Sequence, residues 1–235
     1  MGKDLRWGWA LLILAGPTAL AHELWLEREQ GGAYALYQGH RQGAQSAEER
    51  LPYAPEFVKR AACADGRGAT KSLERPAAYP ARFAGDCAAL LVLTSSGHWT
   101  KTAWETMNRP KAGLAPVLKS WRAEDTVKRL DRWNAAFAHP LSQDLEICPL
   151  QDPFGLRPED KLRLRVTQAG RPRAGLPVAY DGATRGLTSD DGTIVLKIRH
   201  RGMQVIATSL ETPLHDGEAD TLLQATTLQF ELPQQ

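Results

Sequence analysis

The chain has 235 residues, of which 43% are hydrophobic and 24% are charged, and its formal net charge at pH 7 is +2. A charge this close to neutral, without any basic block, argues against nucleic acid or an anionic membrane surface as the partner. Many short apolar runs are interrupted by Gly and Pro, a pattern that favours β structure.

The first 21 residues have the pattern of a cleaved secretory signal. Lys3 and Arg6 give a positive start, residues 7–15 form an apolar run, and residues 19–21 (Ala-Leu-Ala) have the small-x-small form of a signal-peptidase site. The run is too short to cross a bilayer as a helix, which needs about 20 residues. We therefore expect export to the periplasm and a mature chain, residues 22–235, that is not stably inserted in the membrane.

Cleavage at this site makes His22 the first residue of the mature chain. A terminal histidine offers a metal ion both its α-amine and its ring Nδ1, which together close a six-membered chelate ring. The α-amine has a pKa of about 7.7–8.0, so a metal must displace a proton from it at neutral pH. We expect His22 to bind a metal such as nickel or copper. The alternative is that cleavage merely happens to leave a histidine there.

A β-hairpin is expected over residues 23–36, because apolar residues alternate with polar or small ones and Gly31 and Gly32 lie between the two arms. His40 follows the second arm. Since a hairpin returns its far end to its start, we expect His40 to reach His22. The alternative for His40 is a solvated turn residue.

Two further strands are expected at residues 57–61 and 87–93, the second being a continuous apolar run of strand length. His98, Trp99 and Lys101 follow the second run, and site residues often lie just beyond a buried strand. His98 is therefore a candidate metal ligand. The alternative is a strand edge with Trp99 packed into the core.

The three cysteines are Cys63, Cys87 and Cys148. Cys63 and Cys87 both lie beside expected strands, and an exported protein meets an oxidising compartment. We expect a disulfide between these two, worth roughly 3 kcal/mol on the chain-entropy model, with Cys148 as a buried free thiol. The sequence alone leaves all three pairings open.

Residues 120–137 fit either an amphipathic helix or an extended strand. Two prolines and a glycine between residues 152 and 158 then mark a domain boundary. We expect an N-terminal β-rich metal-binding domain at residues 22–152. In the second domain, residues 153–235, alternating strands separated by turns predict an antiparallel β-sandwich. The predicted fold class is mostly β, with two β-sandwich-like domains.

His215 lies in an acidic loop of this second domain. Asp216, Glu218 and Asp220 are spaced by two, as in part of a calcium loop, but the rest of a calcium loop is absent, which favours a solvated loop. His215 remains a candidate ligand that the second domain contributes to the metal site.

Five motifs of the mature chain carry a family resemblance: HELWLE at 22–27, YQGH at 37–40, SGHWTKT at 96–102, LEICPLQDPF at 145–154 and GRPRAGLPV at 170–178. They resemble the NikK-like family, bacterial periplasmic proteins of formally unknown function that are associated with nickel and cobalt uptake. The resemblance implies a periplasmic metal-binding accessory to a transporter, with His22 and His40 in the site. The last motif is similar to transthyretin-like and carboxypeptidase-regulatory-like sandwiches.

The leading interpretation is a nickel- or cobalt-binding protein accessory to metal uptake, not an enzyme. Its ligands would be His22 and His40, completed by His98, His215 or water, and copper generally binds such nitrogen sites more tightly. A second interpretation is a copper histidine-brace oxidase, although no aromatic array is expected near the site. A third is a periplasmic interaction module that needs no metal. The hydrolase motifs G-x-S-x-G and H-E-x-x-H are absent.

Overall fold

The structure is a computed structural model that describes residues 23–41 and 49–234. The expected signal, residues 1–21, and His22 lie outside this range. The described part is mostly β, and none of its helices is long and apolar enough to cross a membrane. Its two 3₁₀ helices are η1 (Pro55–Phe57) and η2 (Ala135–Ala138).

The strands, in chain order, are β1 (Glu23–Arg28), β2 (Tyr34–His40), β3 (Glu49–Arg50), β4 (Val58–Ala64), β5 (Thr70–Leu73), β6 (Ala81–Phe83), β7 (Ala89–Thr102), β8 (Thr106–Met107), β9 (Val117–Leu130), β10 (Glu146–Pro149), β11 (Lys161–Gln168), β12 (Arg171–Pro172), β13 (Pro177–Tyr180), β14 (Ala183–Leu187), β15 (Thr193–Lys197), β16 (Gly202–Pro213) and β17 (Thr221–Leu232).

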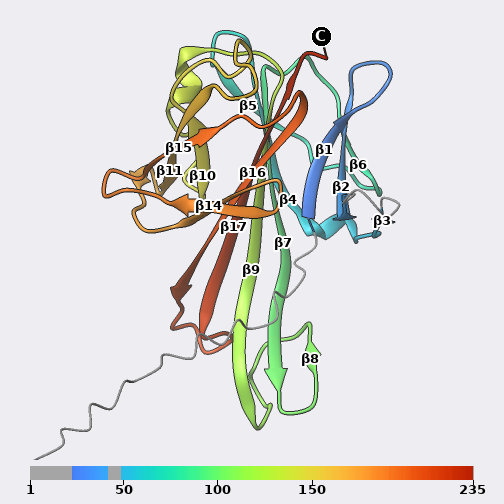
Figure 1. The fold of residues 1–235 in the computed structure, drawn as a ribbon. Coiled ribbons are helices and arrows are strands. Elements are labelled where there is room, and N and C mark those ends of the chain that lie inside the picture. Colours follow the sequence, from blue (N-terminus) through green and yellow to red (C-terminus); the bar gives the residue numbers. More distant parts are fainter. Residues whose placement is uncertain (1–22, 42–48, 235) are drawn as a thin grey trace, which may run out of the picture.

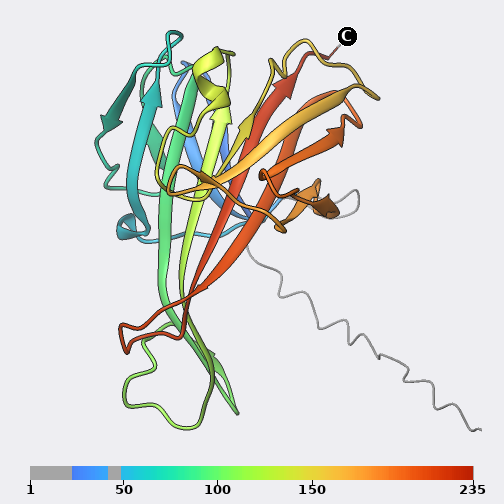
Figure 2. The same cartoon turned by 90° about the vertical axis from the view of Figure 1, so that its left-hand side faces the viewer.

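A nine-stranded sheet runs through the molecule in the order β14-β13-β16-β17-β9-β7-β4-β5, with β8 beside β7 (Figure 1). One four-stranded sheet contains β1, β2, β3 and β6, and another contains β10, β11, β12 and β15. Each small sheet packs on the long sheet through its own apolar core. Figure 2 shows the long central strands extending below both small sheets. The prediction of a mostly β, sandwich-like fold is confirmed.

The predicted hairpin is present as β1 and β2, which pair in antiparallel register. Its turn contains Gly31 and Gly32 at φ angles of 99° and 87°, a backbone region that suits glycine. The predicted disulfide joins Cys63 to Cys87, and Cys148 is a buried free thiol. These predictions are confirmed.

In the ambiguous segment, residues 120–130 belong to strand β9 and residues 135–137 lie in the short helix η2, so the expected amphipathic helix over residues 120–137 is wrong. Alternate residues of a strand face opposite sides of a sheet. Val127 of β9 packs with the β1–β2 hairpin, and Leu130 packs in the core on the other side. Each face of β9 meets a different small sheet, so apolar residues occur on both faces. The alternation of apolar and polar residues that marks a half-buried strand is therefore obscured.

The strand after Cys87 is longer than predicted, since β7 continues to Thr102. A register shift between Ser95 and Gly97 lets it stay paired with β9. His98 therefore lies within β7 and not beyond its end.

Strands from both sides of the expected boundary share the long sheet. β9 and β17 pair in parallel from Trp121 opposite Thr221 to Leu130 opposite Phe230. The core beneath β10, β11 and β15 likewise combines residues from both halves, such as Ala89 and Leu228. The division at residues 152 and 153 stays a prediction, and in the structure the two halves are joined by continuous hydrogen bonding.

Candidate metal sites

The open end of the β1–β2 hairpin carries His40. The strand pairing runs from Arg28 opposite Tyr34 to Glu23 opposite Gly39. His40 is the last residue of β2, is partly buried, and lies opposite Glu49 of β3. His22, the other predicted ligand at this end, lies outside the described residues.

Two hydrogen bonds hold β1 on the long sheet. The backbone N–H of Leu26 donates to Gln229 Oε1 at 2.9 Å, and Arg129 Nη1 donates to the carbonyl oxygen of Leu26 at 3.0 Å. Leu24 and Leu26 pack in one core with Val127. Strand β1 therefore lies over β9 and β17, and it runs in the same direction as both (Figure 1).

Asp125 lies on the same face of β9 as Val127, further toward the open end of the hairpin. It is four residues before Arg129, which contacts Leu26. Burial, and to a smaller degree the charge of Glu124, raises the pKa of Asp125 to about 6. Its side chain makes no hydrogen bond or ion pair with the described residues. This face of β9 thus carries a partly buried carboxylate that pairs with none of the described residues.

We expect Asp125→Asn to stabilise the metal-free protein at pH 7.5. The unfolded chain loses this proton near pH 3.8 and the folded chain near pH 6, so the carboxylate costs stability that grows as pH rises through this window. Removing the charge should raise the free energy of unfolding by roughly 1–2 kcal/mol at pH 7.5 and by almost nothing at pH 4.

Thermal unfolding at the two pH values, without metal, measures this effect. Glu124→Gln is the matched control, because Glu124 directly precedes Asp125 in β9 and faces the other side of the sheet. An Asp125→Asn protein that gains no stability at pH 7.5 would contradict the assignment of a buried, unpaired charge.

A shallow hollow of about 410 Å³ opens beside the end of β2. Gln38 borders it from the hairpin, Tyr53 and Phe57 from the following segment, and Ser96 and Asn108 from the β7 region. The hollow therefore reaches Gln38, two residues before His40 in β2.

His98 lies on the opposite face of the long sheet. It pairs with Arg122 of β9, whose side chain points away from the face that carries Asp125 and Val127. His98 Nε2 lies 3.1 Å from Glu218 Oε2, and with a carboxylate oxygen of Asp216 these atoms lie within 4.8 Å of one another. The structure does not bring His98 and His40 together.

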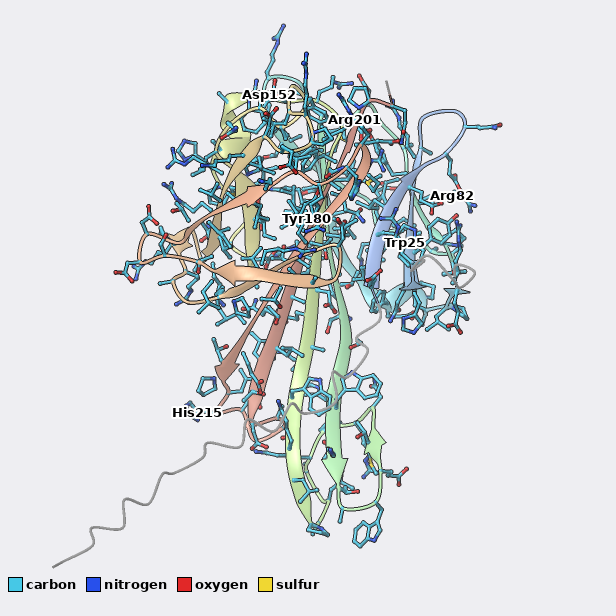
Figure 3. The ribbon with its side chains drawn as sticks, viewed as in Figure 1. Trp25, Arg82, Asp152, Tyr180, Arg201 and His215 are labelled. Carbon is cyan, nitrogen blue, oxygen red and sulfur yellow. A yellow bond between two sulfur atoms is a disulfide. The ribbon has the colours of Figure 1, made fainter. Side chains whose placement is uncertain are left out.

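His215 is exposed and is not part of this group, although it precedes Asp216 in the chain. Figure 3 shows His215 beside the lower ends of β16 and β17, across the long strands from Trp25 of β1. Of the three described candidates, His40 lies at the end of the hairpin, whereas His98 and His215 lie on or beside the group formed with Asp216 and Glu218. The position of His22 is not described.

Sequence reasoning missed Asp125 as a candidate ligand and considered Asp216 and Glu218 only as part of a calcium loop. No sequence signal marks Asp125, since it lies in the segment whose secondary structure was ambiguous. The spacing of Asp216 and Glu218 was a usable signal, but their approach to His98 depends on the parallel pairing of β9 with β17.

A comparison with protein families matches residues 19–212 to one described as a domain of unknown function, DUF4198. No curated protein and no solved structure matches the chain. The matched residues include the β1–β2 hairpin, Asp125 and His98, and they end before the acidic loop.

Proposed function

The chain belongs to this DUF4198 family, and we propose that its mature form binds a nickel or cobalt ion at the amino terminus and serves metal uptake in the periplasm. The motifs that resemble NikK-like proteins support this function. A nickel or cobalt transporter in the membrane is the partner that the proposal implies.

The observation that carries the proposal is the register of β1 and β2. The last described pair is Glu23 with Gly39, and continuing this register by one residue would set the proposed ligand His22 opposite His40. Directly opposed residues of an antiparallel pair have Cβ atoms about 4.5–5.5 Å apart and share a face of the sheet. In this arrangement the α-amine and Nδ1 of His22 and the imidazole of His40 would supply three nitrogen ligands.

Asp125 would complete the group with an oxygen. Arg129 of β9 donates a hydrogen bond to Leu26 of β1. Residue 22 precedes Leu26 by four positions in the sequence, and Asp125 precedes Arg129 by the same number. A cation here would offset the burial cost of the Asp125 carboxylate. Imidazole and amine nitrogens with one carboxylate suit nickel, cobalt, copper and zinc, so supply and partners would select the metal in the cell.

Binding without catalysis is favoured over the copper oxidase alternative. The aromatic residues nearest this end of the hairpin, Trp25 and Tyr37, are only 1% and 7% exposed. They pack against each other within the small sheet and do not form an exposed aromatic platform for a polysaccharide. Metal binding by His22 and His40 needs no redox or hydrolytic step.

A single added residue tests the proposal. We would titrate Ni(II) and Co(II) by calorimetry into a chain that begins at His22 and into one that carries an extra Gly before it. The extra Gly turns the α-amine into a peptide amide, which loses its proton far less readily. We expect binding to weaken roughly 100-fold, equivalent to about 2.8 kcal/mol.

Thermal unfolding of both forms is the control, because the added Gly should leave the fold unchanged. His40→Gln in the authentic form should also weaken binding, and His200→Gln, in the distant second half, should not. Equal affinity in the authentic and extended forms would overturn the amino-terminal site.

A further inference from the structure

We propose a second cation site, formed by His98 with Asp216 and Glu218, that takes a divalent first-row transition-metal ion. It lies on the face of the long sheet opposite the β1–β2 hairpin and does not depend on the amino-terminal site. Asp216 and Glu218 also lie beyond residue 212, where the family match ends.

The loop between β16 and β17 is fixed in place over β9. The N–H of Asp220 donates to the carbonyl oxygen of Ser120 at 3.1 Å, and Ser120 Oγ donates to Asp220 Oδ2 at 2.6 Å. Lys111 donates its backbone N–H to the carbonyl oxygen of Glu218 and its Nζ to Asp220 Oδ1. These contacts use the Asp220 carboxylate and leave that of Glu218 directed toward His98.

Asp216 is also held in position for a ligand. Its Oδ1 accepts hydrogen bonds from the backbone N–H groups of Glu218 and Ala219, which hold the pKa of this carboxyl below its usual range. Asp216 is therefore ionised at neutral pH. Its Oδ2 makes no hydrogen bond with the described residues, and Arg122 Nη1 lies 3.8 Å away, a distance too long for a hydrogen bond.

The strongest indication of a metal site is the environment of His98 Nε2. This nitrogen is shielded from solvent and makes no hydrogen bond within the described part of the chain, although Glu218 Oε2 lies 3.1 Å away. A buried polar nitrogen without a hydrogen bond is costly. Coordination to a cation would satisfy it and would also use the neutral form of the imidazole.

The local charge balance favours a divalent cation. Asp216, Glu218 and Glu124 each bring a carboxylate, and Arg122, close to both Asp216 and Glu124, brings the neighbouring positive charge. The three carboxylates outnumber the one guanidinium by two, so two negative charges remain uncompensated. Metal–ligand bonds of about 2.0–2.2 Å place adjacent ligand atoms about 3–3.5 Å apart, so atoms already within 4.8 Å need only small side-chain movements.

The ligand chemistry selects the class of ion. An imidazole nitrogen with two carboxylates suits zinc, nickel, cobalt and related ions, whereas calcium takes oxygen ligands only. Glu218 is 56% exposed at its side chain, so water can occupy the remaining positions around the ion.

Cobalt titration tests this site in a background where the amino terminus does not chelate. All proteins would carry His22→Ala and His40→Gln, which remove the imidazoles of the proposed amino-terminal site, and Co(II) binding would be followed by calorimetry and by visible absorption. We expect one Co(II) per chain, bound at least tenfold more weakly after His98→Gln or Glu218→Gln. His215→Gln is the matched control, since His215 adjoins Asp216 but lies outside the group, and its binding should be unchanged.

Thermal unfolding without metal would show whether each variant folds. If His98→Gln does not fold, Glu218→Gln decides the matter, because its exposed carboxylate contributes little to stability. Absence of stoichiometric Co(II) binding, or equal binding after Glu218→Gln, would overturn the site. So would a loss of binding in the His215→Gln control. None of these outcomes bears on the amino-terminal site, whose two histidines have been replaced in every protein.

Discussion

Replacing Lys128 with Met should lower the free energy of unfolding by about 3–5 kcal/mol, because it leaves a buried carboxylate without its partner. Lys128 and Glu146 are 1% and 0% exposed at their side chains, and Lys128 Nζ lies 2.7 Å from Glu146 Oε1. Burial lowers the pKa of Lys128, but its partners Cys148 and Glu146 outweigh that effect and raise it. Burial raises the pKa of the Cys148 thiol to about 11, so at neutral pH only Glu146 carries the opposing charge.

Glu146 also organises the turn that precedes β10. Its carboxylate accepts hydrogen bonds from the backbone N–H groups of Leu141 and Ser142 and from Ser142 Oγ. Lys128→Met keeps an unbranched side chain, one atom shorter, and removes the charged donor. The loss should therefore come mainly from the unpaired carboxylate.

Denaturant unfolding of Lys128→Met, Glu146→Gln and the double variant measures this interaction. The double variant has no unpaired buried charge. Its loss in free energy of unfolding should therefore be smaller than the sum of the losses in the two single variants. A Lys128→Met protein within about 1 kcal/mol of the wild type would show that the pair is not a structural element of the core.

Removing the Cys63–Cys87 disulfide should lower stability by about 3–4 kcal/mol on the chain-entropy model. The two cysteines are 24 residues apart, and the bridge ties β4 to the segment just before β7. The double substitution to Ala frees the unfolded chain from this loop, and reducing agent should have the same effect on the wild-type protein.

Cys148→Ala is the matched control for this experiment. Cys148 is equally buried but free, so its replacement should leave the difference between oxidised and reduced protein unchanged. Unfolding curves with and without reductant provide the measurement. A wild-type protein whose midpoint is insensitive to reductant would contradict a stabilising role for the bridge.

Local signals explain which parts of the fold could be predicted. The β1–β2 hairpin follows from alternation around Gly31 and Gly32, and β11 and β15 alternate cleanly because one of their faces is exposed. The disulfide followed from which cysteines lie beside strands. These features depend on neighbours in the chain, and the sequence contains the necessary pattern.

Features that depend on distant segments could not be predicted in the same way. Strand β9 is covered on both faces, so its apolar residues do not follow one period. The position of His98 depends on the register shift between Ser95 and Gly97. The approach of Asp216 and Glu218 to His98 depends on the parallel pairing of β9 and β17, which no local pattern specifies.

The parallel pairing of β9 and β17 also determines the order in which this chain can fold. Trp121 and Thr221 are direct partners although they are 100 residues apart, and closing so long a loop precedes any gain from the contacts. Until β17 has been made, β9 presents an unprotected edge that another chain can pair with. The long sheet is therefore complete only after β17 has paired with β9. Before that pairing, aggregation through the exposed edge of β9 competes with folding.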